Sequence, residues 1–250
     1  MALIERGSFD QFAVSFKPPA FEKAENVKRF ATFGSVRQAT RVVQAAPLEF
    51  ETSKTNCGLA LKSIKLHEDF GGFLQNFFDP TSNIYFLCWS WDLSGNPVTV
   101  YPGEGVPVEQ VVIPMKPGKT REFIGVGILL HPARRVTSGL AVRMNIWESD
   151  KNVRDVGKTL VDVTETIQNS KLNSLLSLIA LSTGVSGVTV ELVKQASLEL
   201  TNVVGNILKA NSDDYVDFFE GYYPASLGWP PSEEETSHGH ACEVTLKKFI

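Results

Sequence analysis

The hydrophobic period of this chain changes from strand-like to helical after Ile146, and that change is the strongest constraint on its fold. From Cys57 to Ile146, apolar residues form short runs such as Ile84–Trp91, separated by turn residues such as those at 94–97. Runs of this kind are typical of antiparallel strands in a sandwich. From Leu160 to Ala210, apolar residues recur at helical spacing instead. The sequence therefore predicts a β-sandwich interrupted by helices.

A chain of 250 residues has room for one large domain with an insertion. We expect an N-terminal extension at residues 1–55, packed on the core, and a sandwich built from residues 56–158 and 236–250. Residues 159–235 are predicted to form a helical hairpin followed by an aromatic loop. The alternating segment Ala241–Leu246 supplies the last strand of the predicted sandwich.

Composition narrows the class of protein. A hydrophobic fraction of 43% and a charged fraction of 21% are typical of a soluble globular protein. The formal net charge of -4 argues against a nucleic-acid partner, which would require basic surface. Three scattered cysteines (Cys57, Cys88 and Cys242) are too few for a disulfide framework, so we expect thiols.

The first residues carry no targeting signal that we recognise. Met1–Phe16 alternates polar and apolar residues and lacks the apolar core of a signal peptide. We therefore expect a soluble protein that is cytoplasmic or released by a non-classical route.

The stretch Leu172–Val190 contains no charged residue and reaches the length of roughly 18 residues that a membrane span needs. Its Ser, Thr and Gly residues make it less apolar than a permanent anchor. One interpretation is a buried helical hairpin that turns near Thr183–Gly187. The other is a segment that folds in water and later inserts into lipid. The residues predicted to insert are Leu175, Leu176, Leu178, Ile179, Leu181, Val185, Val188 and Val190.

Acidic residues gather in the loops between predicted strands. Loop carboxylates are natural ligands for Ca²⁺, which takes six to eight oxygens in irregular geometry. The alternative is that they mark solvated strand ends. The candidate metal ligands are Asp69, Asp79, Glu148, Asp150, Asp155, Asp213 and Asp214.

Three segments resemble the C2 family of calcium- and phospholipid-binding domains. The stretch from Ile64 through Asp79-Pro80 to Phe86 is similar to the first half of a C2 domain, and residues 145–150 to its third loop. Residues 240–246 are similar to its last strand. The resemblance implies a C2-like antiparallel β-sandwich with calcium in its loops, and Glu148 stands where the family has the first aspartate of the third loop. The predicted fold class is thus mainly β with a helical insertion, an α+β protein.

The third loop has two possible ends in this sequence. It closes at Asp155, or it continues through the helices to Asp213 and Asp214. In the second case, the hairpin is an insertion in the loop that C2 domains point at membranes, and it lies beside the cation site. A helical lid over one sheet edge would give the same pattern.

Two weaker patterns lie near the C-terminus. His238, His240 and Cys242 form an H-x-H-x-C run that would suit a transition metal, or else a flexible linker that enters a strand. An aromatic cluster is predicted either to pack the hairpin onto the sandwich or to form an interfacial or glycan-contacting belt. Its members are Tyr215, Phe218, Phe219, Tyr222, Tyr223 and Trp229, interspersed with the carboxylates Asp217 and Glu220.

Enzyme signatures such as G-x-S-x-G, the P-loop and H-E-x-x-H are absent from the sequence, so we expect no enzyme. Three functions are compatible with the patterns. The first is a membrane-engaging, pore-forming protein of toxin or defence type. The second is a calcium-dependent module that binds lipid or protein without insertion, and the third is a structural protein that assembles as a homo-oligomer. The predicted partners are membrane lipid or a cell-surface receptor.

Overall fold

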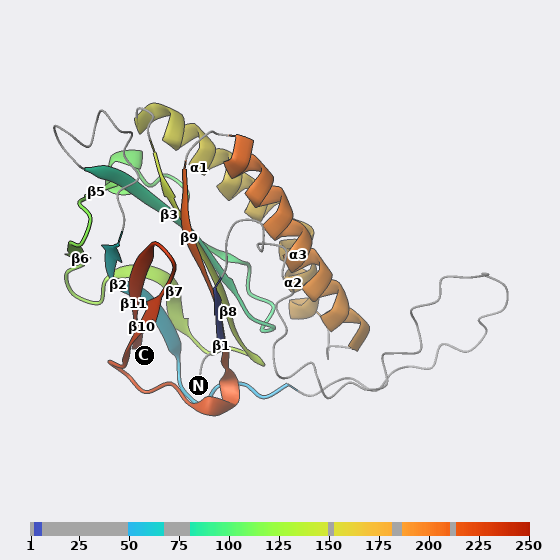
Figure 1. The fold of residues 1–250 in the computed structure, drawn as a ribbon. Helices are drawn as coiled ribbons and strands as arrows, with labels where there is room; N and C mark the ends of the chain where they lie inside the picture. The colour runs from blue at the N-terminus through green and yellow to red at the C-terminus, as the bar shows by residue number, and fades with distance from the viewer. Residues whose placement is uncertain (1–2, 7–49, 68–80, 150–152, 182–186, 211–213) are drawn as a thin grey trace, which may run out of the picture.

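The computed structural model describes residues 3–6, 50–67, 81–149, 153–181, 187–210 and 214–250 (Figure 1). Most of the predicted N-terminal extension, at residues 7–49, lies outside these ranges. The described chain forms two antiparallel sheets and a layer of helices. The predicted mixed α+β class with mainly β structure is therefore confirmed.

The first sheet has three long strands at its centre and three short ones beside them. β8 (Gly139–Glu148) lies between β3 (Ser82–Trp91) and β9 (Asp214–Pro224), and all three run antiparallel. The short strands β4 (Thr99–Tyr101) and β5 (Ile113–Met115) pair with β3, and β1 (Leu3–Arg6) pairs with β9. Nearly every described residue of β3 and β8 is buried, because both faces of this sheet are covered.

The second sheet is built around the strand that opens the sandwich and the strand that closes it. β2 (Cys57–Leu66) pairs with β11 (Cys242–Phe249), and β11 pairs in turn with β10 (Glu234–His238). β6 (Thr120–Glu122) and β7 (Ile128–Arg134) both pair with β2. The predicted terminal strand is therefore present, at the centre of the second sheet. Two short 3-10 helices, η5 (Val108–Gln110) and η6 (Ala225–Leu227), lie in the connections.

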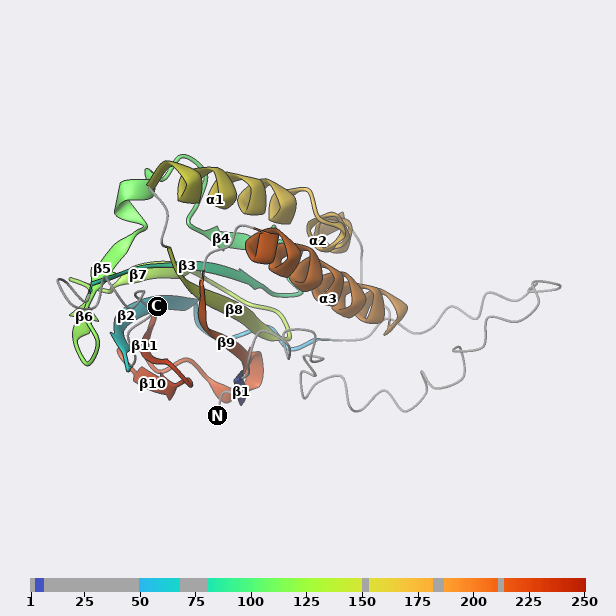
Figure 2. The ribbon, with the colours of Figure 1, turned by 45° about the horizontal axis from the view of Figure 1, so that its top comes forward.

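Side chains alternate across the first sheet and build two separate cores. On β3, Tyr85, Leu87 and Trp89 belong to the core under the helices, whereas Phe86 and Cys88 belong to the core between the two sheets. A period of two places successive residues on opposite faces. The molecule thus has three layers, with the first sheet in the middle, and Figure 2 shows the helices on one side of it and β2, β10 and β11 on the other.

Three helices cover the outer face of the first sheet. α1 (Val153–Gln168) and α2 (Lys171–Leu181) follow each other with only Asn169 and Ser170 between them, and α3 (Gly187–Ala210) packs against both. On α3 the buried apolar residues recur every three or four positions, as an amphipathic helix requires: they are Val190, Val193, Ala196, Leu200, Val204 and Leu208. α2 and α3 pack together as the arms of the predicted hairpin, and residues 182–186 between them lie outside the described residues.

The boundaries differ from the expectation at both ends of the hairpin. The first helix begins at Val153, inside the range assigned to the sandwich, and the predicted aromatic loop contains a long strand, β9. Bulky aromatic residues favour strands when both faces of the sheet are buried. On β9, Phe218 and Tyr222 pack under the helices and Phe219 and Tyr223 pack between the sheets. The prediction that the aromatic cluster packs the hairpin onto the sandwich holds for the first pair.

A buried ion pair links the helix layer to the first sheet. Arg143 on β8 donates to the Glu220 carboxylate on β9, with Nη2 2.6 Å from Oε1, and it also donates to the hydroxyl of Thr201 on α3. Arg143 and Glu220 are register partners, and all three side chains are buried. A buried charge is tolerated only when it is paired and hydrogen-bonded. Because Arg143 also donates to Thr201 on α3, this contact favours one position of α3 on the sheet.

Candidate functional site

The predicted calcium ligands are only partly visible in the described chain. Glu148 is buried at the end of β8, and its register partner Asp214 begins β9. Asp155 lies in the first turn of α1. Asp69, Asp79, Asp150 and Asp213 lie outside the described residues. Within the described ranges, no group of three or more His, Cys, Asp or Glu side chains is arranged to hold a metal ion. Calcium binding therefore stays a prediction.

The expected proximity of the hairpin to the cation site applies to its two outer ends, because α1 begins just after Glu148 and α3 ends just before Asp214. α3 runs from Gly187 at the turn to Ala210, close in sequence to Asp214. At 1.5 Å per residue, α3 spans about 36 Å. Figure 1 shows α1 beginning near the upper ends of β3 and β9, while α2 and α3 meet near the lower end. A cation site at Glu148 would therefore lie near the C-terminal end of α3 and not near Gly187, where α3 begins.

The residues predicted to insert into lipid fall into two groups. Leu176, Ile179 and Val190 are buried in the core under the helices, and Leu175 packs partly against it. Leu178 and Leu181, by contrast, are 61% and 84% exposed near the turn. Val185 and the side chain of Val188 lie outside the described part of the chain. No helix among the described residues is both long and apolar enough to span a membrane.

The loop between β3 and β4 fixes the position of α2. Asn173 accepts a hydrogen bond from the backbone N–H of Val98 at 2.9 Å. Gly95 has a φ of 85°, and a Cβ at this position would lie 2.6 Å from the backbone of Ala180. Glycine is required for such a close approach with a positive φ. The turn end of the hairpin is thus held against a specific loop.

The H-x-H-x-C run does not form one face of a strand. His238 ends β10 and Cys242 begins β11, with His240 in the turn between them. His238 Nδ1 lies 3.2 Å from a carboxylate oxygen of Glu243, whereas Cys242 is buried against Asp217. Cys57, Cys88 and Cys242 are all free and buried, as the sequence predicts, and burial raises the pKa of all three thiols.

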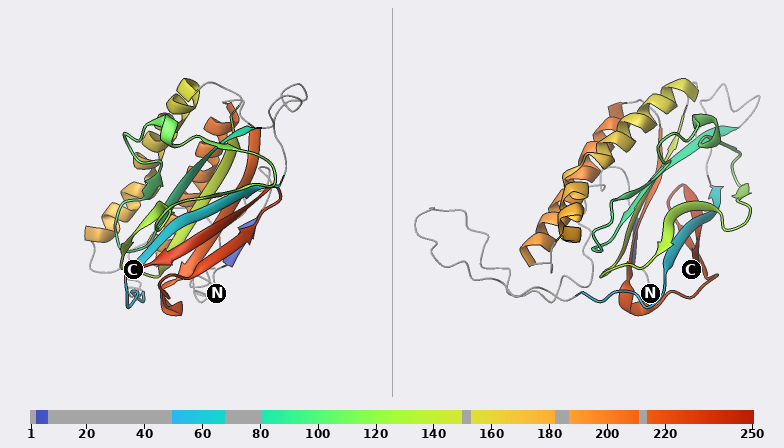
Figure 3. Two further views of the ribbon diagram at one scale, coloured as in Figure 1. Left: turned by 90° about the vertical axis from the view of Figure 1, so that its left-hand side faces the viewer. Right: turned by 180° about the vertical axis from the view of Figure 1, so that it is seen from behind.

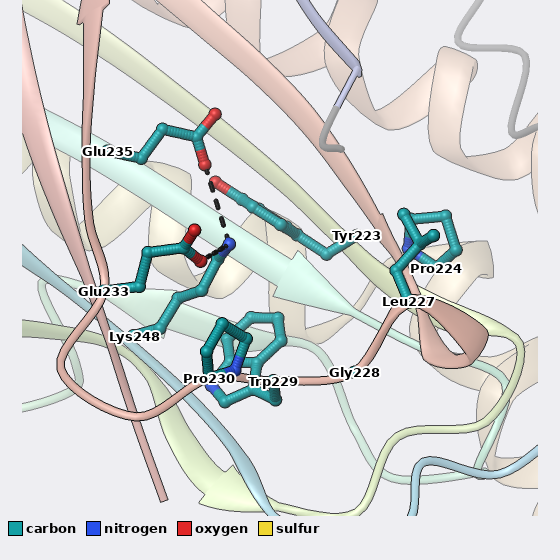
Figure 4. A pocket seen from close by; sticks show the side chains of 9 residues that line it. All are labelled: Tyr223, Pro224, Leu227, Gly228, Trp229, Pro230, Glu233, Glu235 and Lys248. Atoms are coloured by element: carbon teal, nitrogen blue, oxygen red, sulfur yellow. Dashed lines mark hydrogen bonds and ion pairs between the residues drawn. The ribbon is translucent and has the colours of Figure 1, made fainter.

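A pocket of about 280 Å³, which we call the Tyr223 pocket, lies where β9 continues into η6 (Figure 4). Its walls come from the end of β9, the segment 224–230, and the hairpin of β10 and β11. It is lined by Tyr223, Pro224, Leu227, Gly228, Trp229, Pro230, Glu233, Glu235 and Lys248. Gly228 has a φ of 77°, which lets the chain turn sharply between η6 and Trp229.

Two aromatic rings form the inner wall of the Tyr223 pocket. Tyr223 and Trp229 meet edge to face, with ring centroids 5.5 Å apart. The indole N–H of Trp229 donates to the backbone carbonyls of Gly58 and Phe249 at 3.1 and 3.0 Å, so the ring cannot rotate freely. Edge-to-face packing with a satisfied N–H makes this wall rigid.

A charged group lies against these rings. The Lys248 ammonium forms ion pairs with the carboxylates of Glu233 and Glu235, the second at 3.9 Å. The same nitrogen is 5.5 Å from the Tyr223 ring centroid and 5.7 Å from that of Trp229, within the range of a cation–π interaction. The pocket thus holds a cation between two carboxylates and two aromatic rings.

The hydroxyl group of Tyr223 has no hydrogen-bond partner among the described residues, although the side chain is only 5% exposed. In Figure 4 it points toward the side of the pocket where Glu235 and Lys248 lie. Burial, and then the nearby Glu235 carboxylate, raises the pKa of Tyr223, so the hydroxyl stays protonated. An unpaired buried hydroxyl is costly and in a pocket wall is suited to bind a ligand.

Sequence patterns predict only part of this pocket. Tyr223 and Trp229 belonged to the predicted aromatic cluster, but Glu233, Glu235 and Lys248 were not predicted. The sequence does contain an acidic run, Glu233–Glu235, and a lysine pair, Lys247 and Lys248, but only the pairing of β10 with β11 brings them opposite each other.

No protein-family model matches the chain, and neither a curated protein nor a solved structure matches it.

Proposed function

We propose that this chain is a non-enzymatic, C2-like protein of the toxin or defence type that engages membranes through the turn end of its helical hairpin. The observation that carries the proposal is the exposure of Leu178 and Leu181 within the uncharged stretch Leu172–Val190. Exposed leucines that are free of neighbouring charge favour contact with an apolar phase.

The number of exposed leucines indicates shallow and reversible docking as the first step. Each leucine contributes about 2 kcal/mol on full burial, so Leu178 and Leu181 together supply about 4 kcal/mol. That corresponds to roughly millimolar affinity, which further contacts must strengthen. Deeper insertion requires Leu172, Leu176 and Ile179 to leave the core under the helices, at a similar cost for each residue.

The test is vesicle co-sedimentation combined with dye release, using Leu178→Asp and Leu181→Asp. Each variant should lower vesicle binding at least tenfold, because a charge replaces an apolar contact. The matched control is Val203→Asp, which puts the same charge at a 41% exposed position on α3 far from the turn. Ile124→Asp tests the most exposed large apolar residue of the described chain, which is 98% exposed between β6 and β7. Full binding by both leucine variants would disprove the proposal.

An engineered disulfide bond that holds α2 in place distinguishes membrane docking from insertion. Val98→Cys combined with Asn173→Cys would join α2 to the β3–β4 loop at the position of their hydrogen bond. We expect the oxidised variant to bind vesicles but to release no dye, and reduction to restore dye release. Dye release by the oxidised protein would show that the hairpin does not undock during leakage.

Calcium-dependent binding without insertion is the second candidate. It is favoured by the pairing of Glu148 with Asp214 at the end of the first sheet, where the predicted acidic loops begin and end. It predicts vesicle binding that a chelator reverses and that Leu178→Asp does not affect.

A further inference from the structure

We infer that the Tyr223 pocket binds a phosphocholine group, the headgroup of choline lipids. The inference uses the proposed membrane docking only for the source of the ligand. The chemistry of the ligand follows from the pocket itself.

The charges of the pocket favour a ligand that carries a cation. Two carboxylates, Glu233 and Glu235, face one ammonium, Lys248, so the lining has an excess of negative charge. The Lys248 ammonium lies against the rings of Tyr223 and Trp229, and this position shows where the pocket stabilises a cation. Aromatic rings with nearby carboxylates are the recognised environment for quaternary ammonium groups.

The apolar walls favour an alkylated cation over a bare one. Pro224, Leu227 and Pro230 line the pocket beside the aromatic rings. The methyl groups of a trimethylammonium gain from contact with such walls, whereas a primary ammonium has no methyl groups to make these contacts. A volume of about 280 Å³ is available with Lys248 in place.

An anionic group on the same ligand gives Lys248 a new ion-pair partner. When a trimethylammonium takes the place of the Lys248 ammonium beside Glu233 and Glu235, Lys248 needs a new anion. The phosphate of a choline headgroup supplies it and also accepts a hydrogen bond from the unpaired hydroxyl of Tyr223. A phosphocholine group therefore satisfies all the charged side chains and the buried hydroxyl together.

The position of the pocket suits a headgroup in a membrane that the hairpin also contacts. Figure 1 and both views in Figure 3 show η6, which borders the pocket, and the meeting point of α2 and α3 toward the same end of the molecule. A bilayer facing this end would be in reach of both.

Free phosphocholine and tetramethylammonium, measured by titration calorimetry without membranes, test the chemistry. Tyr223→Phe removes only the hydroxyl and should lower phosphocholine affinity about tenfold while leaving tetramethylammonium binding unchanged. Glu235→Gln should weaken both ligands. Lys248→Met should weaken phosphocholine binding but strengthen tetramethylammonium binding, because the competing ammonium is gone.

The control is Glu234→Gln, a neighbouring carboxylate that pairs with Lys247 and does not line the pocket. Absence of phosphocholine binding to the native protein, or weaker tetramethylammonium binding by Lys248→Met, would overturn the inference.

Vesicles of phosphatidylcholine and of phosphatidylglycerol then identify the source of the ligand. Binding of free phosphocholine without preference for the choline vesicles would contradict the lipid headgroup but leave the ligand chemistry intact. Failure of the leucine variants to affect vesicle binding would count against the proposed docking alone.

Discussion

At the scale of single residues, the interior between the two sheets contains a histidine in an unusual state. His131 has no exposed surface, and its Nδ1 lies 2.9 Å from the Ser90 hydroxyl. The Ser90 hydroxyl also lies 3.1 Å from the carbonyl oxygen of Leu130. Nε2 has no hydrogen-bond partner among the described residues. This pair resembles part of a catalytic dyad in composition, but both side chains are buried beyond the reach of a substrate.

Desolvation, together with the positive charge of Arg134, lowers the pKa of His131 to about 3. The unfolded chain binds a proton at this residue below about pH 6.5, whereas the folded protein does not. Stability should therefore fall as the pH drops from 6.5 toward 5, by at most about 1.4 kcal/mol per pH unit. Urea denaturation across this range measures the slope. His131→Gln retains an amide for Ser90 and should flatten the dependence of stability on pH. An equal slope in the native protein and the variant would contradict the assignment of this dependence to His131.

At the scale of secondary-structure elements, a hydrogen bond to the β3–β4 loop helps to hold α2 in place. Asn173 Oδ1 accepts from the nearly buried backbone N–H of Val98. Asn173→Ala leaves this N–H without its partner and should lower the free energy of unfolding by about 1–3 kcal/mol. Asn173→Asp is the matched control, because it retains the acceptor oxygen, and it should cost less. Urea denaturation compares the two variants, and equal losses would show that the hydrogen bond is not what holds α2.

At the scale of the whole molecule, the residues predicted to bind calcium and those proposed to dock on a membrane lie at opposite ends of the helical layer. Glu148 and Asp214 lie near the C-terminal end of α3, which is about 36 Å long, and the exposed Leu178 and Leu181 lie on α2, which ends shortly before α3 begins. Sites this far apart that share no partners should contribute independently. The factor by which Leu178→Asp weakens vesicle binding should therefore be the same in calcium and in chelator. A factor that changes with calcium would show that the two ends are coupled.

The sequence by itself determined the kinds of element and their order. The change from short strand-like runs to helical spacing predicted the sandwich and the hairpin, and the alternating C-terminal segment predicted a last strand, which is β11. These predictions succeed because periodicity is local: the burial of one face imposes a period of two on a strand and 3.6 on a helix. The same local pattern could not separate the aromatic strand β9 from an aromatic loop.

Only the tertiary structure decided which residues meet. The separation of the hairpin turn from Glu148 depends on the antiparallel return of α3, and the Tyr223 pocket depends on the pairing of β10 with β11 beside the end of β9. The difference between buried Leu176 and exposed Leu178 likewise depends on which side of α2 faces the sheet. Contacts between segments far apart in sequence result from packing of the whole chain, and a single sequence records that packing only through the local periods it imposes.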